Sequence, residues 1–325
     1  MVPAVPYTSV ETFTACFHRS RFLLMEGALG ERLKREYGLV FHEQIAMAAL
    51  IETKEGQRAL HALWDQYRSV AQRYGFPFLA TTPTRRANRE RISLSGYSDS
   101  LLAENMAFLK AFQHEKARVP VFAGALMGCR GDAYTGEGAL CEEEAFHFHR
   151  WSAARFRDAG ADFLYAGIMP TLPEGSGMAR ALSETGLPYI ISFTLQRDGR
   201  LIDGTPLFEA ISYIDENGAP PPLCYMANCV HPRIVREAIE QPFNQCDLVF
   251  QRFLGIQANT SSLPYAELDG AVRLQVSDPE ELASETERLL KKTKIKIFGG
   301  CCGTDVRHME QIAKMLRSNL PREED

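Results

Sequence analysis

Eight short apolar runs, separated by stretches with helical periodicity, constrain the fold of this chain more than any other feature of its sequence. Near-continuous apolar strands that alternate with helices are typical of a parallel sheet covered on its faces. Eight such units in 325 residues predict an α/β fold, a single-domain (β/α)8 barrel of the TIM type. The runs lie at residues 21–27, 75–82, 119–126, 161–168, 188–195, 222–229, 253–259 and 295–302.

Within this fold we expect residues 1–20 to be an N-terminal extension, 21–318 the barrel and 319–325 an acidic tail. An open, doubly wound sheet is the alternative. That fold normally brings a glycine-rich phosphate loop after the first strand, and the segment MEGALGERL matches such a loop poorly.

Composition excludes several classes of protein. A formal net charge of −5 without a basic block argues against a nucleic-acid partner. No apolar stretch is long enough to cross a bilayer, and the first residues do not resemble a signal peptide. Eight cysteines are too sparse for a disulfide scaffold in a chain of this length, so we expect a reduced, cytoplasmic protein.

Three of these cysteines lie where a barrel places its chemistry, at the C-terminal ends of the strands. Cys229 ends the sixth run, and Cys301 with Cys302 ends the eighth in the segment IFGGCCGT. Adjacent side chains on a regular strand point to opposite faces. The flanking glycines are therefore expected to turn the backbone so that both sulfurs reach one side.

Three converging thiolates favour zinc, and three protein ligands leave a fourth position open, as in catalytic sites. Such a site is better suited to activating a substrate thiol than to making hydroxide, and alkyl transfer to sulfur is the reaction that fits. Two alternatives remain: small buried residues without a metal, and a vicinal disulfide between residues 301 and 302.

The chain resembles the homocysteine S-methyltransferase family over nearly its whole length. The resemblance is carried by GGCCGT followed by a helix with His308, by ANCVHP, and by ISFTLQRDGRLIDGTPL at residues 191–207. It implies a (β/α)8 barrel in which Cys229, Cys301 and Cys302 hold Zn²⁺. It also implies methyl transfer to homocysteine, giving methionine.

Two segments differ from the family pattern. The family usually has Asp-Gly-Gly after the first strand, where this chain has Glu26, Gly27 and Ala28. After the fourth strand the family typically has a glutamate that helps bind the amino group of homocysteine, and here Gly167 takes its place, with Glu174 further along. Losing a charge-assisted hydrogen bond should weaken binding of an amino acid by roughly 1.5–3 kcal/mol.

The remaining candidate residues also follow strand ends. We expect the substrate to contact Glu26, Gly27, Thr81, Asn228 and Asn259. His147 and His149 are expected to be exposed or half-buried helix residues. The basic segment TRRANRER at residues 84–91 either meets an anionic substrate tail or forms a solvated surface.

These observations predict a zinc-dependent S-methyltransferase that uses a small methyl donor and a small thiol acceptor, and the family resemblance implies homocysteine as that acceptor. One alternative is a methyltransferase for a different thiol or donor, and another is a zinc-binding or thiol-sensing protein without turnover. Any corrinoid methyl donor would have to arrive on a separate protein.

Overall fold

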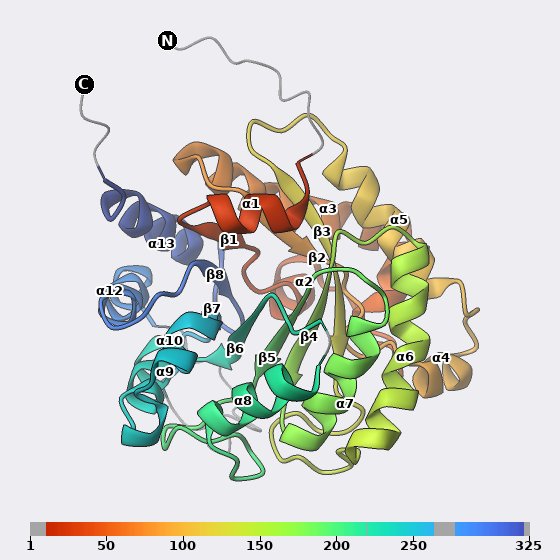
Figure 1. Ribbon diagram of the computed structural model, residues 1–325. Helices are drawn as coiled ribbons and strands as arrows, with labels where there is room; N and C mark the ends of the chain where they lie inside the picture. The colour runs from red at the N-terminus through yellow and green to blue at the C-terminus, as the bar shows by residue number, and fades with distance from the viewer. Residues whose placement is uncertain (1–10, 219, 263–276, 322–325) are drawn as a thin grey trace.

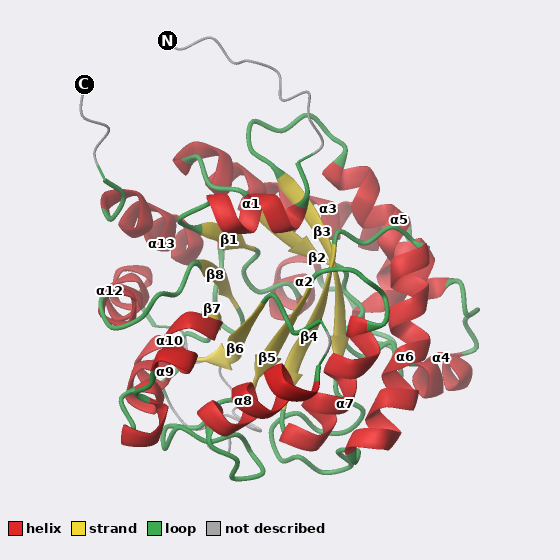
Figure 2. Ribbon diagram, viewed as in Figure 1, coloured by secondary structure: helices red, strands yellow, loops and turns green. Residues whose placement is uncertain are grey.

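The structure is a computed structural model that describes residues 11–218, 220–262 and 277–321 of the chain (Figure 1). Eight parallel strands close into a barrel in the order β1 to β8, with β1 pairing with β8, and helices lie outside the strands (Figure 2). The strands are β1 (Leu23–Met25), β2 (Phe78–Thr81), β3 (Val121–Gly128), β4 (Phe163–Met169), β5 (Tyr189–Phe193), β6 (Cys224–Val230), β7 (Phe253–Ala258) and β8 (Ile297–Gly300). Each overlaps one of the eight predicted runs, which confirms the (β/α)8 barrel.

Helix α1 precedes the first strand, and the later helices lie between successive strands or after the last one. They are α1 (Phe13–Arg19), α2 (Gly30–Tyr37), η1 (Met47–Glu52), α3 (Lys54–Tyr74), α4 (Arg89–Ser95), α5 (Leu101–Gln113), α6 (Glu142–Asp158), α7 (Leu172–Ser183), α8 (Leu207–Asn217), α9 (Pro232–Ile239), η2 (Pro242–Asn244), α10 (Asp247–Arg252), α12 (Pro279–Leu290) and α13 (Val306–Ser318). Among the described residues, no helix is long and apolar enough to cross a membrane.

The core forms two layers because side chains alternate along each strand. In β1, Leu23 and Met25 belong to the cluster inside the barrel, whereas Leu24 belongs to the larger cluster between the sheet and the helices. Burial of both faces explains why the strands read as continuous apolar runs rather than alternating ones.

Helix α1 fills the barrel at the N-terminal ends of the strands. Phe13 stacks on Phe163 with ring centroids 4.4 Å apart and lies 5.5 Å from Phe122, and Cys16 and Phe17 join the same interior cluster. This helix lies within the predicted N-terminal extension, yet its apolar face completes the barrel core. The interior of the barrel is thus filled from this end, and the cysteines lie at the opposite end, the C-terminal mouth.

Candidate metal and thiol site

Three cysteine side chains converge at the C-terminal mouth of the barrel. Cys229 comes from the end of β6, and Cys301 and Cys302 directly follow β8. Their Sγ atoms all lie within 4.8 Å of one another, and those of Cys301 and Cys302 are 4.0 Å apart. In a tetrahedral site with Zn–S bonds of about 2.3 Å, sulfurs lie about 3.8 Å apart. The three sulfurs therefore fit one thiophilic metal ion after small side-chain movements.

A bulge in β6 directs Cys229 toward the other two cysteines. The pairing of β6 with β7 shifts register between Asn228 and Val230, and Cys229 has a φ of 56°. A left-handed conformation at a non-glycine residue costs on the order of 1–3 kcal/mol and is often found at functional sites. This conformation lets the consecutive side chains of Asn228 and Cys229 both serve the C-terminal mouth.

Glycines explain how two adjacent cysteines face the same side. Gly303 has a φ of 82°, and a Cβ atom at Gly300 or Gly303 would clash with Thr304 or Thr260 respectively. The turn is tied to β7, because the amide of Cys301 donates to Ala258 and the amide of Thr260 donates to Cys302. The structure thus gives the backbone turn that the glycine pattern predicts.

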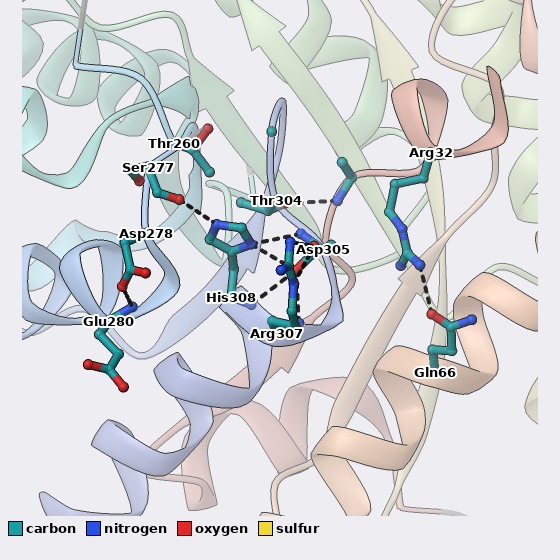
Figure 3. Close-up of polar contacts among 12 residues, drawn as sticks. Arg32, Gln66, Thr260, Ser277, Asp278, Glu280, Thr304, Asp305, Arg307 and His308 are labelled. Atoms are coloured by element: carbon teal, nitrogen blue, oxygen red, sulfur yellow. Dashed lines mark hydrogen bonds and ion pairs between the residues drawn. The ribbon is translucent and has the colours of Figure 1, made fainter. Parts of the chain in front are cut away.

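The loop that carries the two cysteines leads directly into α13, and Figure 3 shows the polar contacts of Asp305, Arg307 and His308 at the start of this helix. Asp305 caps this helix, and hydrogen bonds from Arg307 and His308 lower the pKa of its carboxyl to about 2 although burial opposes this. The Nε2 atom of His308 lies 3.0 Å from the carbonyl of Ser277, to which it donates. His308 therefore connects the cysteine loop to the residue that precedes the cap of α12.

The three thiols share their protons unequally. Hydrogen bonds from Cys301 and Cys302 lower the pKa of Cys229, and the same contacts to Cys229 raise the pKa values of its two partners. Tyr134 also contributes a hydrogen bond that lowers the pKa of Cys229, and Asn259 Nδ2 lies 3.5 Å from its sulfur. Cys229 is thus the thiol that most readily becomes a thiolate.

A pocket of about 200 Å³ opens beside the cysteines. Most of the residues predicted to contact substrate line it, together with two of the cysteines: Glu26, Gly27, Thr81, Asn228, Cys301 and Cys302. Asn259 does not line this pocket and instead contacts the sulfur of Cys229. Its position fits a role in orienting Cys229 better than direct contact with a substrate.

Glu26 is the buried carboxyl group of the pocket. Its oxygens accept hydrogen bonds from the Thr81 amide at 3.0 Å and the Thr81 hydroxyl at 2.5 Å. Burial nevertheless raises the pKa of Glu26 to about 8. A cation bound next to Glu26 would favour the charged form.

At the base of the pocket, the predicted residue Asn228 joins a buried network with two polar side chains that sequence reasoning missed, Tyr165 and Gln257. Asn228 Nδ2 donates to Gln257 Oε1 at 2.7 Å, and the Tyr165 hydroxyl contacts both Gln257, at 2.8 Å, and Asn228. Burial raises the pKa of Tyr165 well above its ordinary value, so its hydroxyl stays protonated. The available signal was the position of Tyr165, two residues before Gly167 and therefore on the same face of β4.

The position of Gly167, where the family resemblance leads one to expect a glutamate, is crowded by neighbouring side chains. A Cβ atom at Gly167 would lie 2.7 Å from Leu126 Cδ1 and 3.3 Å from Asn228 Oδ1. Ile168 follows with a φ of 58° and lines the pocket. The loss of the carboxylate is thus accompanied by apolar packing in the space next to it.

Glu174 does not replace the missing carboxylate. It is fully buried and accepts hydrogen bonds from the amides of Arg130 and Leu140, at 2.7 and 3.3 Å, in the segment between β3 and α6. His149 Nε2 lies 3.1 Å from the same carboxylate. The expectation of a partly exposed His149 was wrong, because this residue is 2% exposed and packs against Glu174, whereas His147 is exposed.

Fold and site together define a (β/α)8-barrel protein with a three-cysteine centre beside a substrate-sized pocket. Residues 23–316 match the family described as Homocysteine S-methyltransferase, and the chain belongs to this family of methyltransferases. Membership agrees with the resemblance seen in the sequence.

Two curated relatives carry the same description. The chain is 27% identical over 199 residues to homocysteine S-methyltransferase YbgG of Bacillus subtilis, an alignment that covers 58% of this chain and 57% of that protein. It is 29% identical over 234 residues to homocysteine S-methyltransferase of Escherichia coli, covering 66% and 72% respectively. The chain thus spans little more than half the length of the first of these relatives.

Solved structures support the fold. The metallated form of the homocysteine methyltransferase MmuM from Escherichia coli superposes with a TM-score of 0.72 at 20% identity, covering 92% of this chain and 98% of that one. The oxidized form gives a TM-score of 0.71 at 18% identity, with coverage of 92% and 97%. Such low identity shows a shared barrel architecture.

Proposed function

We propose that this protein is a zinc-dependent S-methyltransferase that transfers a methyl group from a small donor to a thiol, with homocysteine as the acceptor and methionine as the product. The observation that carries the proposal is the convergence of Cys229, Cys301 and Cys302 beside a pocket that contains a buried carboxyl. The family match, the names of the relatives and the metallated form of MmuM support it.

Cys229, Cys301 and Cys302 would hold the zinc ion, and three protein ligands would leave one position open for the substrate thiol. Bound zinc would keep a substrate thiol in its thiolate form at neutral pH. Asn259 and Tyr134 orient the sulfur of Cys229. The acceptor sulfur would then reach the metal from the side of the pocket.

Glu26 is positioned to bind the ammonium group of the acceptor. The amide and hydroxyl of Thr81 hold its carboxyl group in place. Because burial raises the pKa of this carboxyl, a bound cation favours its ionised form. The apolar side chains of Leu29, Met47 and Ile168 line the same pocket and limit the access of water.

The transfer itself is a displacement at carbon. The acceptor thiol loses its proton to solvent, and its sulfur lone pair forms the new S–CH3 bond. The bond between the methyl group and the donor breaks at the same time, and its electron pair stays with the donor. A sulfonium or quaternary ammonium donor suits this step because it leaves as a neutral molecule, and a separate methylated corrinoid protein is the alternative donor.

A second candidate is methyl transfer to a thiol without an ammonium group. The observation that favours it is the absence of a carboxylate at Gly167, where the side chains of Leu126 and Asn228 lie close instead. A third candidate, a zinc-binding thiol sensor, uses the same cysteines without turnover.

Metal analysis and thiol titration test these functions. We expect one zinc per chain, a fourth sulfur in the X-ray absorption spectrum after homocysteine is added, and methionine formation with S-methylmethionine as donor. Cys302→Ser should abolish transfer, whereas Cys141→Ser, which removes an exposed thiol, should not. A fourth sulfur without methyl transfer from any donor would favour the sensor, and an unchanged spectrum would exclude homocysteine as the acceptor.

A further inference from the structure

A second pocket continues outward from the thiol pocket. The two share Gly30, Glu31, Met47, Pro83 and Arg85, so they adjoin each other between α2 and the segment that follows β2, and we refer to them together as the cleft. The outer pocket is the part lined additionally by Lys34, Phe41, His42, Glu43, Ala46 and Arg86. A ligand that reaches the cysteines can therefore extend into the outer pocket.

Arg85 is the cationic side chain common to both pockets. It is half-buried, and within the described part of the chain its guanidinium has no hydrogen-bond or ion-pair partner. The carboxylate of Asp132 lies close enough for Arg85 to lower its pKa, but that carboxylate already accepts hydrogen bonds from the amides of Tyr134 and Thr135. A half-buried guanidinium with five donors and no acceptor is strongly suited to an anion.

The backbone is shaped to place Arg85 there. A Cβ atom at Gly128, the last residue of β3, would lie 2.6 Å from the carbonyl oxygen and 2.8 Å from Cγ of Arg85. Glycine at this position lets the arginine pack directly over the end of the neighbouring strand. Arg85 is thus held by close packing rather than by an ion pair.

The other charged groups of the outer pocket leave it cationic around Arg85. Lys34 lies 4.8 Å from the centre of the Phe41 ring, and burial together with the charges of Arg91 and Arg85 lowers the pKa of Arg86. Of the two carboxylates, Glu31 accepts a hydrogen bond from the amide of Gly303, and Glu43 is exposed. The outer pocket therefore has three cationic side chains and two carboxylates, and one of these carboxylates already accepts a hydrogen bond from the backbone.

We propose that the outer pocket is an anion subsite in which Arg85, supported by Arg86 and Lys34, binds a carboxylate on one of the two substrates. This inference rests on the proposed thiol methyl transfer and adds the chemical class of the ligand. The cleft lacks the family's carboxylate at Gly167 but keeps Glu26, so Arg85 adds recognition of a negative group beside the position proposed for a positive one. The carboxylate belongs either to the thiol acceptor or to the methyl donor.

Matched ligands with and without the carboxylate distinguish these sources. For the acceptor we would compare 4-mercaptobutyrate with 4-mercaptobutanamide, and for the donor 3-(dimethylsulfonio)propionate with its amide. Calorimetry on the zinc-loaded protein measures binding of each compound, and initial rates give KM and kcat. We expect the carboxylate of one pair to bind about tenfold to hundredfold more tightly than its amide.

Arg85→Gln should remove that preference by weakening the carboxylate while leaving the amide unchanged, and Arg85→Lys should restore part of it. Arg89→Gln is the matched control, because Arg89 carries the same charge in the same segment but lines neither pocket. Equal binding of carboxylate and amide in both pairs, or a preference that survives in Arg85→Gln, would overturn the proposal. Because binding is measured without turnover, absence of methyl transfer would refute the proposed function without deciding the anion subsite.

Discussion

The two ends of the barrel differ in the role of their side chains, although the same eight strands form both ends. At the N-terminal end, α1 inserts Phe13 among Phe122 and Phe163 and leaves an apolar floor. At the C-terminal end, left-handed residues, bulges and glycine turns expose sulfur, carboxyl and guanidinium groups to a cleft. One end is built for packing and the other for chemistry, as is usual in this fold.

We therefore expect substitutions at the N-terminal end to lower mainly stability, and substitutions at the C-terminal mouth to lower mainly activity. At the C-terminal mouth the protein accepts local strain, such as the φ of 56° at Cys229, which only the surrounding structure maintains. At the floor, close-packed aromatic rings have no comparable strain. Measuring both stability and activity for the same variant therefore shows which end a residue serves.

The largest expected effect is the loss of a cysteine ligand at the C-terminal mouth. Cys302→Ser should lower zinc content to well below one per chain and reduce kcat/KM by at least about 1,000-fold, because transition-state stabilisation of about 4 kcal/mol is lost. Metal analysis and initial rates check this, with Cys141→Ser as control. Thermal unfolding of the two metal-free proteins should agree within a few degrees, and a large difference between them would mean that Cys302 also serves packing.

The converse substitution lies in the floor. Phe13→Ala should lower the free energy of unfolding by about 3–5 kcal/mol, because it leaves a cavity among Phe122 and Phe163. Urea unfolding measures the loss, and His18→Ala, on the exposed side of α1, should cost far less. At a temperature where Phe13→Ala remains folded, its kcat should equal that of the wild type. A reduced kcat would show that the two ends are coupled.

Glu26, at the C-terminal mouth, should make the stability of the protein depend on pH. Its carboxyl has a pKa of about 8 in the folded protein against an ordinary value near 4.5, so the folded state holds its proton more tightly. The corresponding stability is fully present below pH 4.5 and is lost as the pH rises through about 8.

Glu26→Gln should therefore remove a fall in stability of a few kcal/mol between these pH values. Melting temperatures of the metal-free proteins across this range test the sign, because zinc would be lost from thiolate ligands at the acidic end. Phe13→Ala should keep the wild-type pH dependence at a lower overall stability. If Glu26→Gln retains the full fall, another buried group is responsible.

The sequence predicted the architecture well because hydrophobic periodicity is a local signal that all eight strands repeat. It also located Cys229, Cys301 and Cys302, since barrel topology brings the ends of β6 and β8 close together whatever the details of the loops. The N-terminal extension was harder. Nothing in residues 12–20 distinguishes an apolar helix that packs on the surface from one that closes the barrel.

The missed parts of the site depend on tertiary detail. In the sequence, Tyr165 and Gln257 resemble ordinary interior residues. Only the register of β4, β6 and β7 brings them next to Asn228. Arg85 reads as one more charge in a basic segment, and only its close packing on Gly128 directs it into the cleft. Side-chain direction at a bulge or after a strand is set by neighbours that are distant in sequence.

The smallest expected effect lies between the two ends, in the network below the pocket. Tyr165→Phe removes a buried hydroxyl that contacts Asn228 and Gln257, and Tyr225→Phe removes one that donates to Asp215 at 2.8 Å. Each should lower the free energy of unfolding by about 1–2 kcal/mol. Because Asn228 lines the pocket, only Tyr165→Phe should also raise the KM for the thiol, by several-fold. Equal KM values in the two variants would mean that Tyr165 contributes to packing, like the residues at the N-terminal end, and not to the thiol pocket.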